Sequence, residues 1–363
     1  MSSDPSDWAA PGSGQHRPDP VPLSGGDRPP GPHERPKPGI VPLRPLGVSE
    51  ILDGAISYIR SNPVTTLGLS AVVIAITQLV QLPLSTYVLG RVPAVPATAT
   101  SADLTALLAA TLGSAALGGL VSFVAGTILT GLLITVLGQA VLGRRTPLGG
   151  AWAATRGRVP GLLGLSLLTT LVLVVVVVVG FLPGVLVAAL GGSGGVLLTV
   201  VGGLLAAAVA IFLGVAWSMI TPAYVLEGIP AMSAFRRSYR LVRPQWWRIF
   251  GILLLGAIIT TIIGVVLGLP FGFVTTLLDG SPDPTTGTVP TPGLAGSVVT
   301  AVGSIVVGTI TAPFGAGISG LLYLDQRMRR EAFDLELLRA AQSPGAPLPG
   351  APDPDPGIPH PPR

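Results

Sequence analysis

The chain has 363 residues, of which 49% are hydrophobic and only 10% are charged, and its mean hydropathy is +0.69. This composition excludes one or two ordinary soluble domains and is typical of a protein with several membrane spans. The net charge is +4 and there is no cysteine, so disulfides and thiolate metal sites are excluded. The basic residues border apolar stretches, which favours a membrane-orientation signal over nucleic-acid binding.

Both ends of the chain are rich in proline. Residues 1–45 contain 12 prolines and residues 342–363 contain 9, and neither segment shows apolar periodicity. Such segments cannot bury a core, so we predict two disordered tails around a membrane domain at residues 46–341. The N-terminus lacks the pattern of a cleavable signal, and we expect the first span to direct insertion.

Six apolar stretches are long enough to span a membrane, which requires roughly 20 residues. The third and fourth share a run of 68 uncharged residues between Arg158 and Glu227, which a glycine-rich break at residues 191–195 divides. The other four predicted spans lie at about residues 64–89, within 104–142, at 249–278 and at 294–324.

The arginines indicate how these spans are oriented. Six spans place every arginine cluster on one side, namely Arg44, Arg60, Arg144, Arg145, Arg156, Arg158, Arg236, Arg237, Arg240, Arg243, Arg248, Arg327, Arg329 and Arg330. Splitting residues 104–142 into two spans would move the later clusters to the other side, so we predict a single span there. By the positive-inside rule, both termini are expected to be cytoplasmic, in a plasma membrane.

A short segment precedes each pair of spans, with apolar residues at helical spacing and a proline near the membrane. The three apolar sets are Val48, Ile51, Leu52, Ala55, Ile56 and Ile59; Leu148, Ala151, Trp152 and Thr155; and Met232, Phe235, Tyr239 and Val242. This spacing predicts amphipathic helices in the membrane interface. The expected fold is therefore an all-α polytopic membrane protein built from three units, each an interfacial amphipathic helix followed by a helical hairpin.

Two stretches carry a family resemblance. The first is Leu43–Ala55 with Tyr58, Arg60 and Asn62-Pro63, and the second is Glu227-Gly228 with Pro230, Ala234–Ser238, Arg243 and Trp247. They resemble bacterial membrane proteins grouped with the glycerophosphoryl diester phosphodiesterase membrane domain, over roughly residues 43–335. The resemblance implies a helical membrane domain of undefined biochemical role in a bacterial membrane. The phosphodiesterase barrel that some members carry has no counterpart in this chain.

Catalytic chemistry is not expected. A phosphodiester hydrolase needs histidines and carboxylates around a divalent metal, whereas His16, His33 and His360 all lie in the proline-rich tails. No nucleotide-binding or nucleophile motif is present. We therefore predict a non-enzymatic protein without catalytic residues, metal or cofactor.

Transport is the main alternative to an accessory, scaffold or envelope-homeostasis role. The predicted spans contain no ionisable residue of the kind that marks ion pathways. However, prolines at positions 83, 183, 222 and 270 predict interrupted helices, which can form substrate sites for small molecules or lipids. Gly264, Gly268 and Gly272 recur every four residues and predict close approach of a neighbouring helix.

The third amphipathic segment supplies the candidate binding residues. Arg236, Arg237, Arg240, Arg243 and Arg248 are candidates for contact with anionic lipid phosphates, although topology signalling alone also explains them. The predicted interface anchors are Trp152, Phe235, Trp246 and Trp247. The expected partners are membrane lipids and, through the tails or amphipathic helices, a cytoplasmic protein, with no nucleic acid.

Overall fold

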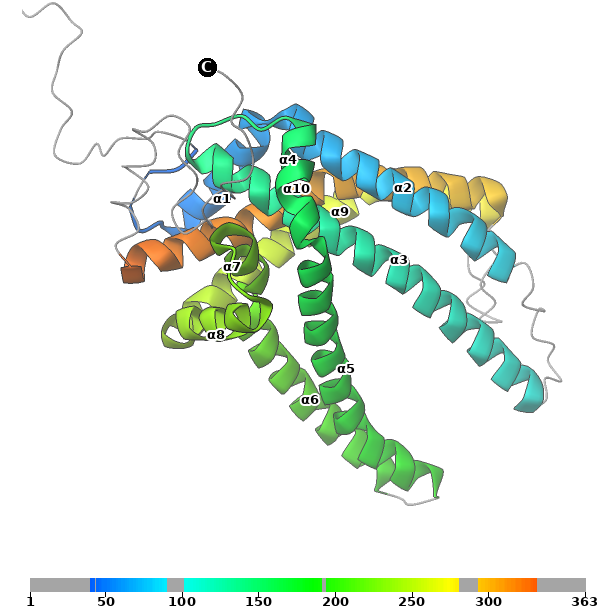
Figure 1. Cartoon of the computed structure of the whole chain (residues 1–363). Helices are drawn as coiled ribbons and strands as arrows, with labels where there is room; N and C mark the ends of the chain where they lie inside the picture. Colours follow the sequence, from blue (N-terminus) through cyan, green and yellow to red (C-terminus); the bar gives the residue numbers. More distant parts are fainter. Residues whose placement is uncertain (1–39, 43, 90–100, 191–193, 281–292, 332–363) are drawn as a thin grey trace, which may run out of the picture. The chain divides into compact units, whose positions relative to one another are not determined.

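The computed structural model describes residues 40–42, 44–89, 101–190, 194–280 and 293–331 (Figure 1). Within these ranges the chain is helical and contains no strand. The two predicted disordered tails lie outside the described residues, except for Ile40 to Pro42, Arg44 and Pro45. Val41 is buried, so the packed body begins before residue 46.

Ten α-helices follow one another along the described chain. They are α1 (Val48–Ser61), α2 (Pro63–Leu89), α3 (Ser101–Val141), α4 (Leu148–Thr155), α5 (Val159–Ala189), α6 (Gly195–Trp217), α7 (Ile220–Glu227), α8 (Ala231–Val242), α9 (Trp246–Asp279) and α10 (Leu294–Glu331). The six candidate spans, long and apolar enough to cross a membrane, fall on α2, α3, α5, α6, α9 and α10. The polytopic all-α prediction is therefore confirmed, and α3 is a single helix as predicted.

The arginine-bearing end of the bundle is the end at which α2, α5 and α9 begin and α3, α6 and α10 finish. The packed core lies here, where α1, α3 and α10 meet around Tyr58, Ile134, Leu137, Leu321 and Tyr323. The hydroxyl of Tyr58 donates a hydrogen bond to the carbonyl oxygen of Leu133 at 2.8 Å, and burial raises the pKa of Tyr58 above its ordinary value.

Away from this end, large apolar side chains cover the outer surfaces of α5, α6, α9 and α10. They include Leu171, Val179, Leu204, Ile262, Leu269 and Val302. Exposing apolar surface on this scale to water would be energetically unfavourable, whereas contact with lipid acyl chains carries no such cost. The exposure pattern is therefore that of a multi-pass membrane protein.

Three of the four predicted helix interruptions are wrong. α2 continues through Pro83, α5 through Pro183 and α9 through Pro270. Proline is tolerated inside membrane helices because neighbouring groups satisfy the freed carbonyl. The fourth prediction falls near a real break, since α6 ends at Trp217, α7 begins at Ile220 and Pro222 lies in the first turn of α7.

Ser238 of α8 satisfies the backbone groups at this break. Its hydroxyl donates to the carbonyl oxygen of Ala216 at 2.7 Å, and it accepts the amide N–H of Met219 at 3.3 Å. Ser238 is fully buried. The interruption between α6 and α7 is thus held by a side chain from α8.

The prediction of three equivalent amphipathic helices holds for α1 and α8 but not for α4. α4 is a short helix with apolar residues on all sides, and Leu148 and Trp152 are exposed. In α8 the buried residues are Ala234, Ser238, Leu241 and Val242, whereas Met232 and Tyr239 of the predicted apolar face are exposed. Small residues at positions 234 and 238 let α8 approach the break, and this rotates the buried face.

Helices α5 and α6 run side by side and extend away from α2 and α3 (Figure 1). The two helices approach closely at Gly180 and Gly202, where a Cβ atom on Gly202 would lie 2.1 Å from the carbonyl oxygen of Gly180. The predicted glycine row makes a looser contact, because a Cβ atom on Gly264 would lie 3.6 Å from Val307 and one on Gly272 would meet nothing.

Candidate functional site

A buried carboxylate joins three segments at the arginine-bearing end. Asp325 of α10 is 0% exposed and accepts hydrogen bonds from Arg248 at 2.5 Å and from Arg329 at 2.8 Å. It also accepts the amide N–H of Leu46 at 2.8 Å, and both arginines donate to the carbonyl oxygen of Leu46 at 2.8 Å. This Asp325 network therefore fixes the segment before α1 to α9 and α10.

A second network connects α7, α8 and α10. Glu227, the last residue of α7, accepts three hydrogen bonds from Arg237 of α8 and one from the hydroxyl of Tyr323 of α10. Arg327 lies 3.4 Å from the same carboxylate, and Glu331 pairs with both Arg237 and Arg327. Charges with this many partners hold helix ends in fixed positions.

The sequence interpretation missed all three carboxylates of these networks. One signal was present, because Glu227 is the only acidic residue between Asp103 and Asp279 and lies next to an arginine cluster. Asp325 and Glu331 gave no comparable signal, since they lie in a segment of mixed charge.

The structure divides the five arginines predicted to contact lipid. Arg237 and Arg248 are engaged by buried or half-buried carboxylates, as described above. Arg236, Arg240 and Arg243 are exposed, and among the described residues none of them has an ion-pair partner.

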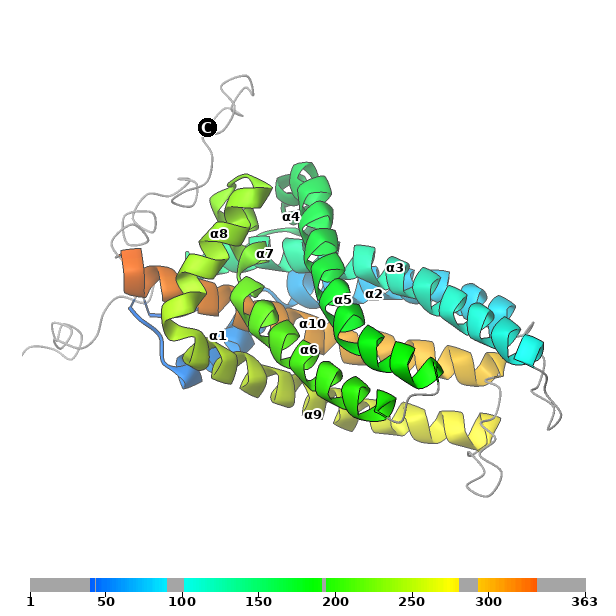
Figure 2. The same cartoon turned by 90° about the horizontal axis from the view of Figure 1, so that it is seen from below.

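These three arginines share one surface of α8 with two apolar side chains. Met232 is 61% exposed and Tyr239 is 40% exposed. The spacing of positions 232, 236, 239, 240 and 243 places them along one stripe of the helix. α8 runs across the direction of α9 and α10 (Figure 2). We call these five residues the basic stripe.

The four predicted interface anchors also fall into two groups. Trp152 and Trp247 are exposed, the latter by 77%. Phe235 packs edge-on against Trp217 with ring centroids 5.4 Å apart, and Trp246 stacks between Phe212 and Phe250. Phe235 and Trp246 therefore contribute to helix packing as well as lying near the predicted interface.

A basic pocket of about 480 Å³ lies at the same end, where α2 begins. Arg60 and Arg145 line it together with Asn62, Thr65 and Thr146. The hydroxyl of Thr65 donates to the carbonyl oxygen of Thr146 at 2.8 Å, which ties its two walls together. The sequence interpretation had treated both arginines only as orientation signals.

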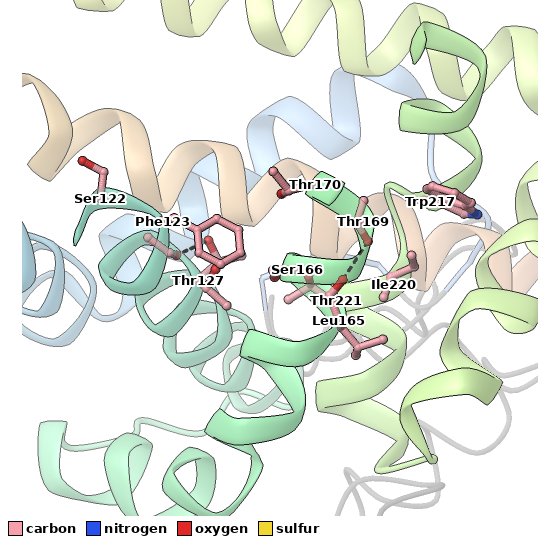
Figure 3. A pocket seen from close by; sticks show the side chains of 12 residues that line it. Ser122, Phe123, Thr127, Leu165, Ser166, Thr169, Thr170, Trp217, Ile220 and Thr221 are labelled. Atoms are coloured by element: carbon pink, nitrogen blue, oxygen red, sulfur yellow. Dashed lines mark hydrogen bonds between the residues drawn. The ribbon is translucent and has the colours of Figure 1, made fainter. Parts of the chain in front are cut away.

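A different cavity, of about 380 Å³, lies between α3, α5 and the break that precedes α7 (Figure 3). Among the described residues no ionisable side chain lines this cavity, which we call the hydroxyl cavity. Its polar lining consists of hydroxyl groups, and its apolar lining includes Phe123, Leu165, Trp217 and Ile220. Figure 3 shows Thr127 on one side of the gap and Ser166, Thr170 and Thr221 on the other.

The described ranges contain no candidate metal site, because no group of three or more His, Cys, Asp or Glu side chains comes together there. The three histidines, at positions 16, 33 and 360, lie outside the described residues. Gln81 donates to the hydroxyl of Ser122, which lines the cavity between α3, α5 and α7, at 2.6 Å.

A family model described as "Domain of unknown function (DUF7847)" matches residues 46–323, so the chain belongs to this family. No curated protein matches the chain, and no solved structure matches it. The resemblance to the glycerophosphoryl diester phosphodiesterase membrane domain therefore stays a prediction.

Proposed function

We propose that this member of the DUF7847 family is a non-enzymatic accessory or scaffold protein of the bacterial cytoplasmic membrane. In this proposal the arginine-bearing end and both termini face the cytoplasm, as the positive-inside rule requires. The observation that carries the proposal is the basic stripe of α8, where exposed arginines alternate with exposed apolar side chains.

The chemistry of the stripe suits an anionic lipid surface. A guanidinium group holds a phosphate through two parallel hydrogen bonds, and each arginine near an anionic membrane contributes roughly 1 kcal/mol. Met232 and Tyr239 supply apolar surface that can enter the boundary between headgroups and acyl chains. The basic pocket at Arg60 and Arg145 adds a second concentration of positive charge at the same end.

The scaffold part of the proposal is supported by how the helix ends are joined. The Asp325 network and the Glu227 network connect α7, α8, α9, α10 and the segment before α1 through buried or half-buried ion pairs. These ion pairs favour a rigid surface at the arginine-bearing end, to which a cytoplasmic protein or a lipid headgroup can bind. The non-enzymatic part rests on the absence of catalytic motifs in the sequence.

The test compares two triple variants of the full-length protein that lose the same charge. One carries Arg236→Gln, Arg240→Gln and Arg243→Gln, and the other carries Arg44→Gln, Arg156→Gln and Arg330→Gln, which are also exposed. Detergent-solubilised protein is titrated with phosphatidylglycerol or phosphatidylcholine while the melting temperature is followed. We expect phosphatidylglycerol to stabilise the wild type and the control variant more than the stripe variant, with a difference that salt removes. Equal stabilisation of both variants would contradict the proposal.

A small-molecule or lipid transporter is the second candidate. The hydroxyl cavity favours it, because substrate sites of transporters commonly form where a membrane helix is interrupted. An ion-coupled cycle would also need an ionisable group at mid-span, and the sequence has none between the ends of the six spans. For this reason the scaffold remains the preferred proposal.

A further inference from the structure

Membrane helices usually satisfy a serine or threonine hydroxyl on their own backbone. In this chain the hydroxyls of Thr77, Thr199, Thr260 and Thr309 each donate to the carbonyl oxygen four residues earlier, at 2.6–2.8 Å. This bond removes the cost of placing a hydroxyl in a medium that offers no water.

Four hydroxyls of the cavity between α3, α5 and α7 do not make this hydrogen bond to their own helix. The side-chain hydroxyls of Thr127, Ser166, Thr170 and Thr221 make no hydrogen bond with any residue that the structure describes. Thr261 and Ser297 also lack one, but neither lines this cavity. Two other lining residues keep the usual bond, since Thr130 donates to Gly126 at 2.8 Å and Thr169 donates to Leu165 at 2.9 Å.

The four unpaired hydroxyls come from three different helices and face one gap (Figure 3). Each can donate one hydrogen bond and accept two. Phe123 and Trp217 add aromatic faces to the same lining. A volume of about 380 Å³ is in the range of cavities that hold small molecules.

We propose that this cavity binds a neutral polyhydroxylated group, such as the sugar headgroup of a membrane glycolipid or a free sugar. Hydroxyl-rich ligands match hydroxyl linings because both sides donate and accept. A charged ligand would leave its charge unpaired, since none of the described residues that line the cavity has an ionisable side chain. The exposed apolar surfaces of α5 and α6 give acyl chains a place beside the headgroup. The proposal goes beyond the role of α8 and does not depend on it.

The chain offers a matched pair of variants for the test. Thr127→Val with Thr170→Val removes two unpaired hydroxyls, and Thr130→Val with Thr169→Val removes two that are bonded to their own helix. All four positions line the same cavity, and each change replaces a hydroxyl with a methyl group of similar size. Full-length protein is prepared in a detergent without a sugar headgroup, and ligand binding is followed by tryptophan fluorescence and by native mass spectrometry.

The probes are a diglucosyl diacylglycerol, the free disaccharide, a diacylglycerol with the same chains and a phosphatidic acid with the same chains. We expect the diglucosyl lipid to bind, and the first variant pair to weaken it roughly tenfold or more while the control pair changes it less than about twofold. Binding of the free disaccharide as well identifies a soluble ligand, and its absence identifies a lipid headgroup.

Equal binding of diacylglycerol would overturn the proposal, as would equal effects of the two variant pairs. Phosphatidic acid can bind at the basic stripe, so it counts against the proposal only if the first variant pair weakens its binding as much as that of the diglucosyl lipid. If the first pair does not fold, Ser166→Ala repeats the comparison at a single position of the cavity. In that case unchanged binding of the diglucosyl lipid would overturn the proposal.

Discussion

Replacing Asp325 with Asn should detach the segment before α1. The change keeps the size of the side chain but removes the charge that Arg248 and Arg329 share, and it places an N–H donor against a guanidinium group. Removing one partner of a buried ion pair typically costs about 3–5 kcal/mol. Because both arginine side chains are 28% exposed, water screens them in part, and we expect a loss near the lower limit, about 3 kcal/mol.

The matched control is Arg44→Gln. Arg44 pairs with Glu50 at 2.6 Å, but its side chain is 53% exposed, and exposed ion pairs contribute about 0–1 kcal/mol. Unfolding in mixed micelles of increasing denaturing detergent, followed by tryptophan fluorescence, gives the free-energy difference for each variant. Cleavage by chymotrypsin after Leu46, whose side chain is fully buried, should also become faster in the Asp325→Asn protein. If Asp325→Asn loses no more stability than Arg44→Gln, the Asp325 network does not anchor this segment.

Two further predictions concern topology and helix packing. In this cysteine-free chain, Gly149→Cys should react with a membrane-impermeant thiol reagent only from the cytoplasmic side and Gly194→Cys only from the outside, and a Cβ atom has room at both positions; labelling of both from one side would contradict the six-span topology. Gly202→Ala should lower the melting temperature, because its Cβ would lie 2.1 Å from the carbonyl oxygen of Gly180, whereas Gly164→Ala meets nothing within 4 Å and should leave the melting temperature unchanged or raise it; equal effects would show that α5 and α6 do not pack as described.

The six spans could be predicted because their signals are local. A run of apolar residues of sufficient length identifies a membrane helix without knowledge of its neighbours, and arginines beside it indicate its orientation. The predicted helix interruptions at Pro83, Pro183 and Pro270 were wrong, because whether proline ends a membrane helix depends on the groups that surround it. The glycine row at positions 264, 268 and 272 also makes a looser contact than predicted, because the faces of two helices that meet decide where they approach closely.

The candidate site depended on contacts between distant positions, which no local pattern contains. Asp325 and Leu46 are separated by 279 residues, and Glu227 and Tyr323 by 96. The rotation of α8 was mispredicted for the same reason. Its hydrophobic spacing fits more than one face, and only the position of Ser238 against the break after α6 shows which face is buried.

Ion pairs and uncharged hydroxyl groups lie in different parts of this chain, and each place suits the polarity of its surroundings in a membrane. The ion pairs gather at the arginine-bearing end, where water and lipid phosphates can compensate charge, and the uncharged hydroxyls occur along the spans. A hydroxyl within a span costs little when it bonds to its own helix, whereas a hydroxyl without such a bond is available to a ligand. Four available hydroxyls at one cavity, beside two that bond to their own helix, therefore favour a ligand that is polar but uncharged. Charged lipid groups are expected instead at the basic stripe of α8, where arginines without ion-pair partners among the described residues are exposed.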